Sequence, residues 1–131
     1  MAVVGASSGI GLATARAAAA RGARVILLSR SQARLDEAAA SVTGGTTRAV
    51  AMDMLDAAAV DRAMASIGGV DHLVLTAVAD ELASRAPIKE LTAEQVERSF
   101  DKLRGFVNVL RAAAPLLRER GSVTLVAGAS A

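Results

Sequence analysis

Short aliphatic runs alternate with longer stretches rich in Ala, Arg and Leu along most of the chain. The run Val25-Ile26-Leu27-Leu28 is apolar throughout, which is typical of a strand covered on both faces of a sheet. The longer stretches repeat their apolar residues with helical spacing. The alternation predicts strands over 2–5, 24–28, 48–52, 71–76 and 122–126, and helices over 10–21, 32–41, 57–67 and 92–118.

Residues that begin and end helices stand at the borders of these segments. Ser31 and Asp56 are placed to cap the second and third helices. Thr92 and Gln95 have the spacing of a capping box at the start of the long fourth helix, whose last turns Pro115 is expected to kink. The segment 78–91 has no clear period and is predicted to be a loop.

The resulting order, strand and helix in strict alternation, predicts an α/β protein with a doubly wound parallel sheet. Right-handed crossovers favour the strand order 3-2-1-4-5 in a three-layer αβα arrangement, with residues 1–131 as one domain. Ligands of such sheets bind beyond the carboxyl ends of the strands where the strand order reverses. We therefore expect the site between the first and fourth strands.

Composition narrows the possible classes of protein. The hydrophobic share of 53% is inflated by Ala, and no apolar run approaches the roughly 18 residues of a membrane span. The first residues lack the basic start of a signal peptide, and the chain has no Cys, so a cytoplasmic location is expected. With one His and no Cys we expect no metal site. The net charge is only +2 and Arg is scattered among acids, which disfavours nucleic-acid binding.

A glycine-rich turn follows the first predicted strand and opens the first predicted helix, with the sequence Gly5-Ala6-Ser7-Ser8-Gly9-Ile10-Gly11. Small residues let the backbone approach a ligand, and a helix N-terminus offers free N–H groups to a phosphate. The Gly-Lys-Ser/Thr of an ATP-binding P-loop is absent. A phosphate-binding turn is favoured over a tight turn that binds nothing.

The spacing Gly5-x-x-x-Gly9-Ile10-Gly11 resembles the cofactor turn of the short-chain dehydrogenase/reductase family. The resemblance extends over the whole chain and implies a Rossmann fold that binds NAD or NADP. Val4 stands where the family usually has Thr. The residues that would contact the cofactor in this turn are Gly5, Ser7, Ser8, Gly9, Ile10 and Gly11.

The end of the second predicted strand favours NADP over NAD. A dinucleotide site places an acid there to bind a ribose 2′-hydroxyl, or an Arg to bind a 2′-phosphate. This chain has Ser29, Arg30 and Ser31, with no carboxylate before Asp36. Arg30 suits a phosphate and both serines can donate further hydrogen bonds, although Arg30 can also be an ordinary solvated residue.

The ends of the third and fourth predicted strands match the family in part. Asp53 corresponds to the acid that binds the adenine amino group, with Met54 packing nearby. The family's Asn-Asn-Ala-Gly is replaced by Leu75-Thr76-Ala77-Val78, in which Ala77 is retained as a cofactor contact. Leu75 can contribute only apolar packing, and Val78 adds bulk beside the expected nicotinamide.

The catalytic positions of the family match poorly. Lys102 aligns with an Asn that holds a water in the proton relay, and Gly128 stands where the catalytic Ser is expected. The candidate catalytic residues are Lys102 and Ser130, which lies two residues after Gly128. The alternative for Ser130 is an ordinary serine near the chain end, and the alternative for Lys102 is a lysine in solvent. The family's Tyr-x-x-x-Lys would follow about a dozen residues after the fifth strand, beyond Ala131. We expect the cofactor-binding half of an enzyme, truncated after the fifth strand.

Three hypotheses for the function follow. The first is an NADP-dependent oxidoreductase that reduces a carbonyl or oxidises an alcohol by hydride transfer. The second is a non-catalytic nucleotide-binding or partner-binding module, a degenerate or truncated homologue. The third is a partial product of a longer gene, in which case a Tyr-x-x-x-Lys would follow soon after Ala131.

Assembly and core are also predicted. A helically spaced apolar stripe on the long helix is expected to be core, and comprises Phe100, Leu103, Val107, Leu110, Ala114 and Leu117. The resemblance implies that helix 92–118 also forms a subunit interface. A fifth strand left at the sheet edge makes a homo-oligomer more plausible than a monomer. His72 lies at the amino end of the sheet, away from the expected site, and is taken as structural.

Overall fold

The computed structural model describes residues 1–78 and 86–127. Its sheet has five parallel strands in the order β3-β2-β1-β4-β5, which confirms the predicted fold class and strand order. The central strand β1 pairs Ala2 with Ile26 on one side and with Leu73 on the other. The strands are β1 (Ala2–Val4), β2 (Arg24–Ser29), β3 (Thr46–Ala51), β4 (Val70–Leu75) and β5 (Leu117–Leu125).

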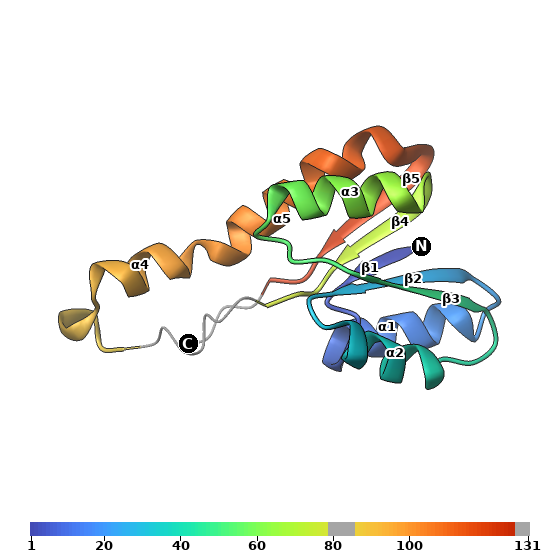
Figure 1. Cartoon of the computed structure of the whole chain (residues 1–131), viewed down its shortest axis with the longest axis horizontal. Coiled ribbons are helices and arrows are strands. Elements are labelled where there is room, and N and C mark those ends of the chain that lie inside the picture. The colour runs from blue at the N-terminus through green and yellow to red at the C-terminus, as the bar shows by residue number, and fades with distance from the viewer. Residues whose placement is uncertain (79–85, 128–131) are drawn as a thin grey trace.

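Helices cover both faces of the sheet (Figure 1). The helices α1 (Gly9–Ala19) and α2 (Gln32–Ala40) pack on one face, and α3 (Ala57–Ile67) and α5 (Asp101–Ala113) pack on the other. Alternate residues of each inner strand enter opposite cores: Val3 joins one and Val4 the other. This double burial explains the continuous apolar runs Ala2–Val4 in β1, Val25–Leu28 in β2 and Leu73–Leu75 in β4.

The predicted caps are present. The side chain of Ser31 accepts a hydrogen bond from the Arg34 N–H, and that of Asp56 accepts one from the Ala59 N–H. Thr92 and Gln95 form both bonds of a capping box at the start of α4 (Ala93–Ser99). These local signals therefore predicted where the helices begin.

The prediction of one long helix over 92–118 was wrong, because two helices and a short 3-10 turn occupy this segment. At the break, the Ser99 hydroxyl donates to the Val96 carbonyl and the Phe100 N–H donates to the Glu97 carbonyl, so the turn is tighter than an α-helix. The helix α5 ends before Pro115, and the 3-10 turn η3 (Ala114–Leu116) leads into β5.

The strand β5 begins earlier than the predicted 122–126. Leu117 pairs with Val70 and Ser122 pairs with His72, with an irregularity in the register between them. Nδ1 of His72 lies 2.9 Å from the Ser122 hydroxyl, in keeping with a structural role for this histidine.

The prediction that the apolar stripe of the long helix is core was wrong for four of its six residues. Phe100, Leu103 and Val107 are 50%, 61% and 53% exposed, and Ala114 is exposed as well. The helix α5 carries a second apolar face at helical spacing, Phe106, Val109 and Ala113, and this face packs on the core. Periodicity identifies apolar faces but does not tell which of two faces a neighbour covers.

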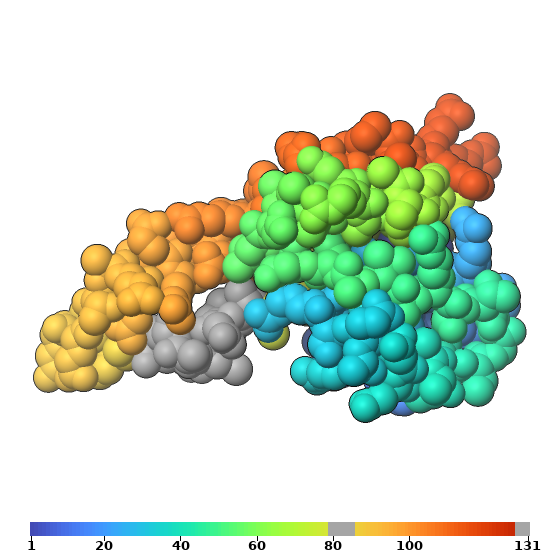
Figure 2. All heavy atoms as spheres, viewed as in Figure 1, coloured from blue at the N-terminus to red at the C-terminus, as the bar shows by residue number. Residues whose placement is uncertain are grey.

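The segment around α4 extends away from the sheet (Figure 2). No residue of α4 or of the short 3-10 turn η2 (Ile88–Glu90) is buried, and Ile88 is 86% exposed. Among the described helices, none has the length and apolar character needed to cross a bilayer.

Candidate functional site

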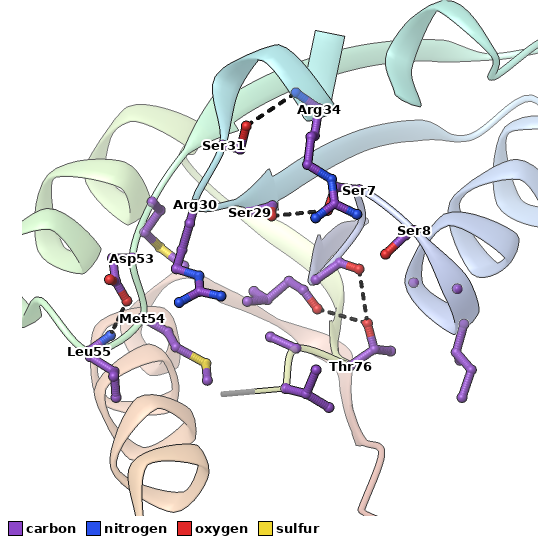
Figure 3. Close-up of a pocket in the computed structure, with 18 of the residues that line it drawn as sticks. Ser7, Ser8, Ser29, Arg30, Ser31, Arg34, Asp53, Met54, Leu55 and Thr76 are labelled. Carbon is purple, nitrogen blue, oxygen red and sulfur yellow. Dashed lines mark hydrogen bonds between the residues drawn. The ribbon is translucent and has the colours of Figure 1, made fainter. Parts of the chain in front are cut away.

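A pocket of about 680 Å³ lies at the carboxyl ends of β1 to β4, where the strand order reverses (Figure 3). Its position matches the expectation for a doubly wound sheet, and its volume is within the usual range for ligand sites. All the cofactor residues that the sequence predicted line this one pocket, namely Gly5, Ser7, Ser8, Gly9, Ile10, Gly11, Ser29, Arg30, Ser31, Asp53, Met54 and Ala77.

The glycine turn is forced by its neighbours. Gly5 has φ +88°, and a Cβ there would lie 2.5 Å from the Ala77 amide nitrogen. A Cβ at Gly11 would meet the Gly5 carbonyl and lie 2.5 Å from Oγ1 of Thr76. Main-chain bonds fix the turn on β2, since the N–H groups of Gly5 and Ala6 donate to the Leu28 carbonyl at 2.8 and 3.2 Å. Glycine is therefore required here for packing against β4 as well as for approach to a ligand.

Thr76 links β4 to this turn. Its hydroxyl donates to the Val4 carbonyl at 2.9 Å, and its side chain fills the space left by Gly5 and Gly11. Leu75, where the family has Asn, is fully buried in the apolar core. The polar side-chain bond between the ends of β4 and β1 therefore comes from Thr76, and Leu75 contributes apolar packing.

The end of β2 presents hydroxyl groups and a cation to the pocket. The hydroxyl oxygens of Ser7 and Ser29 are 3.1 Å apart, which joins the glycine turn to β2. Ser31 is engaged as the cap of α2. Arg30 is exposed and its side chain extends over the pocket (Figure 3). Among the described residues, no carboxylate forms an ion pair with Arg30.

The loop after β3 forms another wall. Oδ1 of Asp53 accepts a hydrogen bond from the Leu55 N–H at 2.9 Å, which folds the loop back on itself. Met54 is 6% exposed and packs against Gly105 of α5, where a Cβ would lie 2.5 Å from the Met54 Cγ. The Asn108 side-chain amide donates to the Met54 carbonyl at 3.0 Å. The helix α5 therefore holds this wall in place.

The candidate catalytic residue Lys102 is not brought together with the pocket. Lys102 on α5 places its amino group 5.7 Å from the centroid of the Phe106 ring, and it is not among the lining residues. Ser130 and Gly128 lie outside the described residues.

Several lining residues were missed by the sequence reasoning, which followed only strand ends and the glycine motif. They are Val4, Arg34, Met52, Leu55, Thr76, Arg98 and Asp101, whereas Val78, also in the lining, was expected beside the nicotinamide. Arg34 had a usable signal, because the third residue after a cap lies in the first turn of a helix that starts at the site. Arg98 and Asp101 had none, since their place depends on how α4 and α5 meet.

A model of the family described as short chain dehydrogenase matches residues 1–131. The chain belongs to this family. The match covers the glycine turn and all five strands, so the resemblance stated from the sequence is confirmed.

Individual family members agree with this assignment. The chain is 40% identical over 120 residues to human L-xylulose reductase, covering 91% of this chain and 47% of that protein. It is 38% identical over 125 residues to the 3-dehydrosphinganine reductase TSC10A of Arabidopsis thaliana, covering 90% of this chain and 36% of that one. The crystal structure of Gluconobacter frateurii L-sorbose reductase, complexed with NADPH and L-sorbose, matches with a TM-score of 0.83 and 32% identity, over 95% of this chain and 50% of that one. This chain thus spans about half the length of these reductases, or less.

The pocket has the features that a dinucleotide of this family needs. A Cβ at Gly9 would have nothing within 4 Å, so the backbone is open at the start of α1, and α1 presents its N-terminus to the same pocket. The pocket also combines an apolar wall, Met52 and Met54, with the cation of Arg30. The residues present therefore fit an NAD or NADP molecule.

Proposed function

We propose that residues 1–131 are the NADP-binding domain of an oxidoreductase that reduces a carbonyl or oxidises an alcohol. The observation that carries the proposal is the convergence of every predicted cofactor residue on one pocket at the switch point of the sheet. Membership of the short chain dehydrogenase family and the similarity to named reductases support the reaction class. The substrate is proposed only as a small carbonyl or alcohol compound.

When bound, the nicotinamide supplies the hydride chemistry. The protein's part is binding and orientation. The glycine turn exposes N–H groups at the start of α1 to a pyrophosphate, with the small side chains of Ser7 and Ser8 beside it. Asp53, fixed by its bond from the Leu55 N–H, keeps acceptor capacity for an adenine amino group, and Met54 offers an apolar surface. Ala77 adds no bulk at the end of β4.

NADP is proposed over NAD because the end of β2 carries a cation and no acid. The exposed guanidinium of Arg30 suits a phosphate, and the Ser29 and Ser31 hydroxyls add hydrogen-bonding capacity. An acid at this strand end would instead select a free ribose hydroxyl.

Calorimetric titration with NADPH and with NADH tests the cofactor assignment. We expect tighter binding of NADPH, and loss of this advantage in Arg30→Ala. Arg62→Ala is the matched control, because Arg62 is also an exposed arginine and lies on α3 outside the pocket lining. A folded chain that binds neither cofactor would overturn the proposal.

Catalysis within this chain stays a prediction carried by Lys102 and Ser130. Lys102 can serve a proton relay only if its amino group leaves the Phe106 ring, where a cation–π contact holds it. Turnover of aldehydes and ketones with NADPH by this chain would favour the enzyme. Cofactor binding without turnover would favour the alternative of a non-catalytic module, for which Val78, 61% exposed in the pocket wall, is the supporting observation.

We also propose that the chain forms a homo-oligomer through α4 and α5. The exposed Val96, Phe100, Leu103 and Val107 lie at helical spacing along these helices. Beside them run Glu97 and Arg104, so the surface carries both charges and can face its own copy across a twofold axis. Light scattering coupled to gel filtration is expected to give a multimer, and Leu103→Glu a monomer. A monomeric unchanged chain at micromolar concentration would contradict this.

The cytoplasmic location is proposed from the sequence alone. Fractionation of expressing cells followed by immunoblotting tests it. Recovery of the protein in the cytoplasmic fraction is the expected result, and recovery with membranes or outside the cell would contradict it.

A further inference from the structure

A second arginine, Arg34, lines the pocket together with Arg30. Arg34 lies in the first turn of α2, and its N–H is bound to the Ser31 hydroxyl, which fixes that turn at the end of β2. Its side chain extends toward the region where Ser7 and Ser29 meet (Figure 3). Two guanidinium groups on different elements thus line one pocket.

Neither arginine is neutralised by the part of the chain that the structure describes. Arg98, Arg104, Arg111 and Arg118 all form ion pairs, whereas Arg30 and Arg34 form none with a described carboxylate. Among the acids near them, Asp36 accepts a bond from Gln32 at 2.7 Å, Asp53 accepts one from the Leu55 N–H, and Asp101 faces Arg104.

This arrangement suits a dianion rather than a hydroxyl. A phosphate monoester carries close to two negative charges near neutral pH and has three terminal oxygens. One planar guanidinium can bind two of those oxygens, which leaves the third for a second donor. A free hydroxyl at this corner would leave both cations without a partner.

We infer that Arg34 is a second specificity-determining residue, which binds the 2′-phosphate of NADP together with Arg30. The inference rests on the proposed function and deepens it. It assigns the preference for NADP to two elements, the end of β2 and the start of α2, instead of to one strand end.

The test uses adenosine 2′,5′-bisphosphate and 5′-AMP, which differ only in the 2′-phosphate, titrated into the whole chain by calorimetry. Arg34→Ala is expected to weaken binding of the bisphosphate about tenfold or more, the scale of a lost charged hydrogen bond. Binding of 5′-AMP is expected to stay within about twofold, because the 5′-phosphate contacts the glycine turn. Arg34→Lys keeps the charge but not the planar guanidinium group. Its affinity for the bisphosphate is expected to lie between those of Arg34→Ala and the unchanged chain. Arg62→Ala is the control, and circular dichroism establishes folding of each variant.

The outcomes separate this inference from the proposed function. Weaker binding of the bisphosphate by Arg34→Ala, with unchanged binding of 5′-AMP, supports the role of Arg34. Equal affinity of Arg34→Ala and the unchanged chain for the bisphosphate, with loss in Arg30→Ala, overturns the role of Arg34 and leaves NADP binding in place. Equal affinity of the unchanged chain for both nucleotides overturns the phosphate assignment alone. Binding of neither nucleotide by a folded chain overturns the proposed function as well.

Discussion

The glycine turn and the α4–α5 pair lie on opposite sides of the same pocket and are held in different ways. The turn is fixed from every side: main-chain bonds join it to β2, and Thr76 and Ala77 leave no room for a side chain at Gly5. The helix α4 has no buried residue. The helix α5 packs one apolar face on the core and exposes its other apolar face to solvent. The glycine turn is therefore a pocket wall with one sterically allowed conformation. The position of the α4–α5 wall depends instead on what covers its exposed apolar face.

The largest effect is expected from Gly5→Ala. The new Cβ meets the backbone of Ala77, which cannot move aside, and the positive φ adds strain, so we expect a loss of about 3 kcal/mol or more. Gly22→Ala is the control: it has φ +82° with nothing within 4 Å of its Cβ, and should lose only about 1–2 kcal/mol. Urea unfolding measures both, and equal losses would show that the turn is not sterically fixed.

The two phenylalanines test the α4–α5 side. Phe106 is 7% exposed in the core, so Phe106→Ala should cost about 3 kcal/mol. Phe100 is 50% exposed, and Phe100→Ala should change the unfolding free energy of the monomer by less than about 0.5 kcal/mol. The comparison is made by urea unfolding at a dilution where gel filtration shows monomer. A large loss in Phe100→Ala under those conditions would mean that the exposed face is covered within one chain.

Thr76→Val should cost about 1 kcal/mol and weaken NADPH binding. The substitution keeps the shape and removes the hydroxyl bond to the Val4 carbonyl, which retains its bond from the Thr76 N–H. Thr76→Ser restores the hydroxyl and should recover the binding. Unfolding and NADPH titration are measured together; a Ser variant that binds as poorly as the Val variant would show that the hydroxyl bond alone does not account for the effect.

The smallest effect is expected at the start of α4. Thr92→Ala removes the capping-box acceptor of the Gln95 N–H and should destabilise this helix by about 1 kcal/mol, with little change in global unfolding. Hydrogen exchange of the α4 amides measures the local effect, with Thr92→Ser as the control that keeps the cap. Faster exchange across the whole sheet would instead show that α4 is part of the cooperative core.

The sequence predicted the features that depend on local sterics and on strand order. Ser31, Asp56 and Thr92 marked helix starts, and the glycine spacing placed the turn, because each acts within a few residues. The exposure of Leu103 was not predicted, since it depends on packing with distant elements, and the break at Phe100, where the Ser99 hydroxyl donates to the Val96 carbonyl, was missed as well. For the same reason Arg98 and Asp101 were missed in the pocket, whereas every residue predicted from strand ends lines it.

The bonds that attach the glycine turn to β2 run from the Gly5 and Ala6 N–H groups to the Leu28 carbonyl, all main-chain atoms. No side-chain identity at residues 6 or 28 is needed to make them. Substitutions there can accumulate during evolution while the turn keeps its shape, provided that size and burial are respected. The shape of the turn is thereby uncoupled from side-chain identity at these two positions.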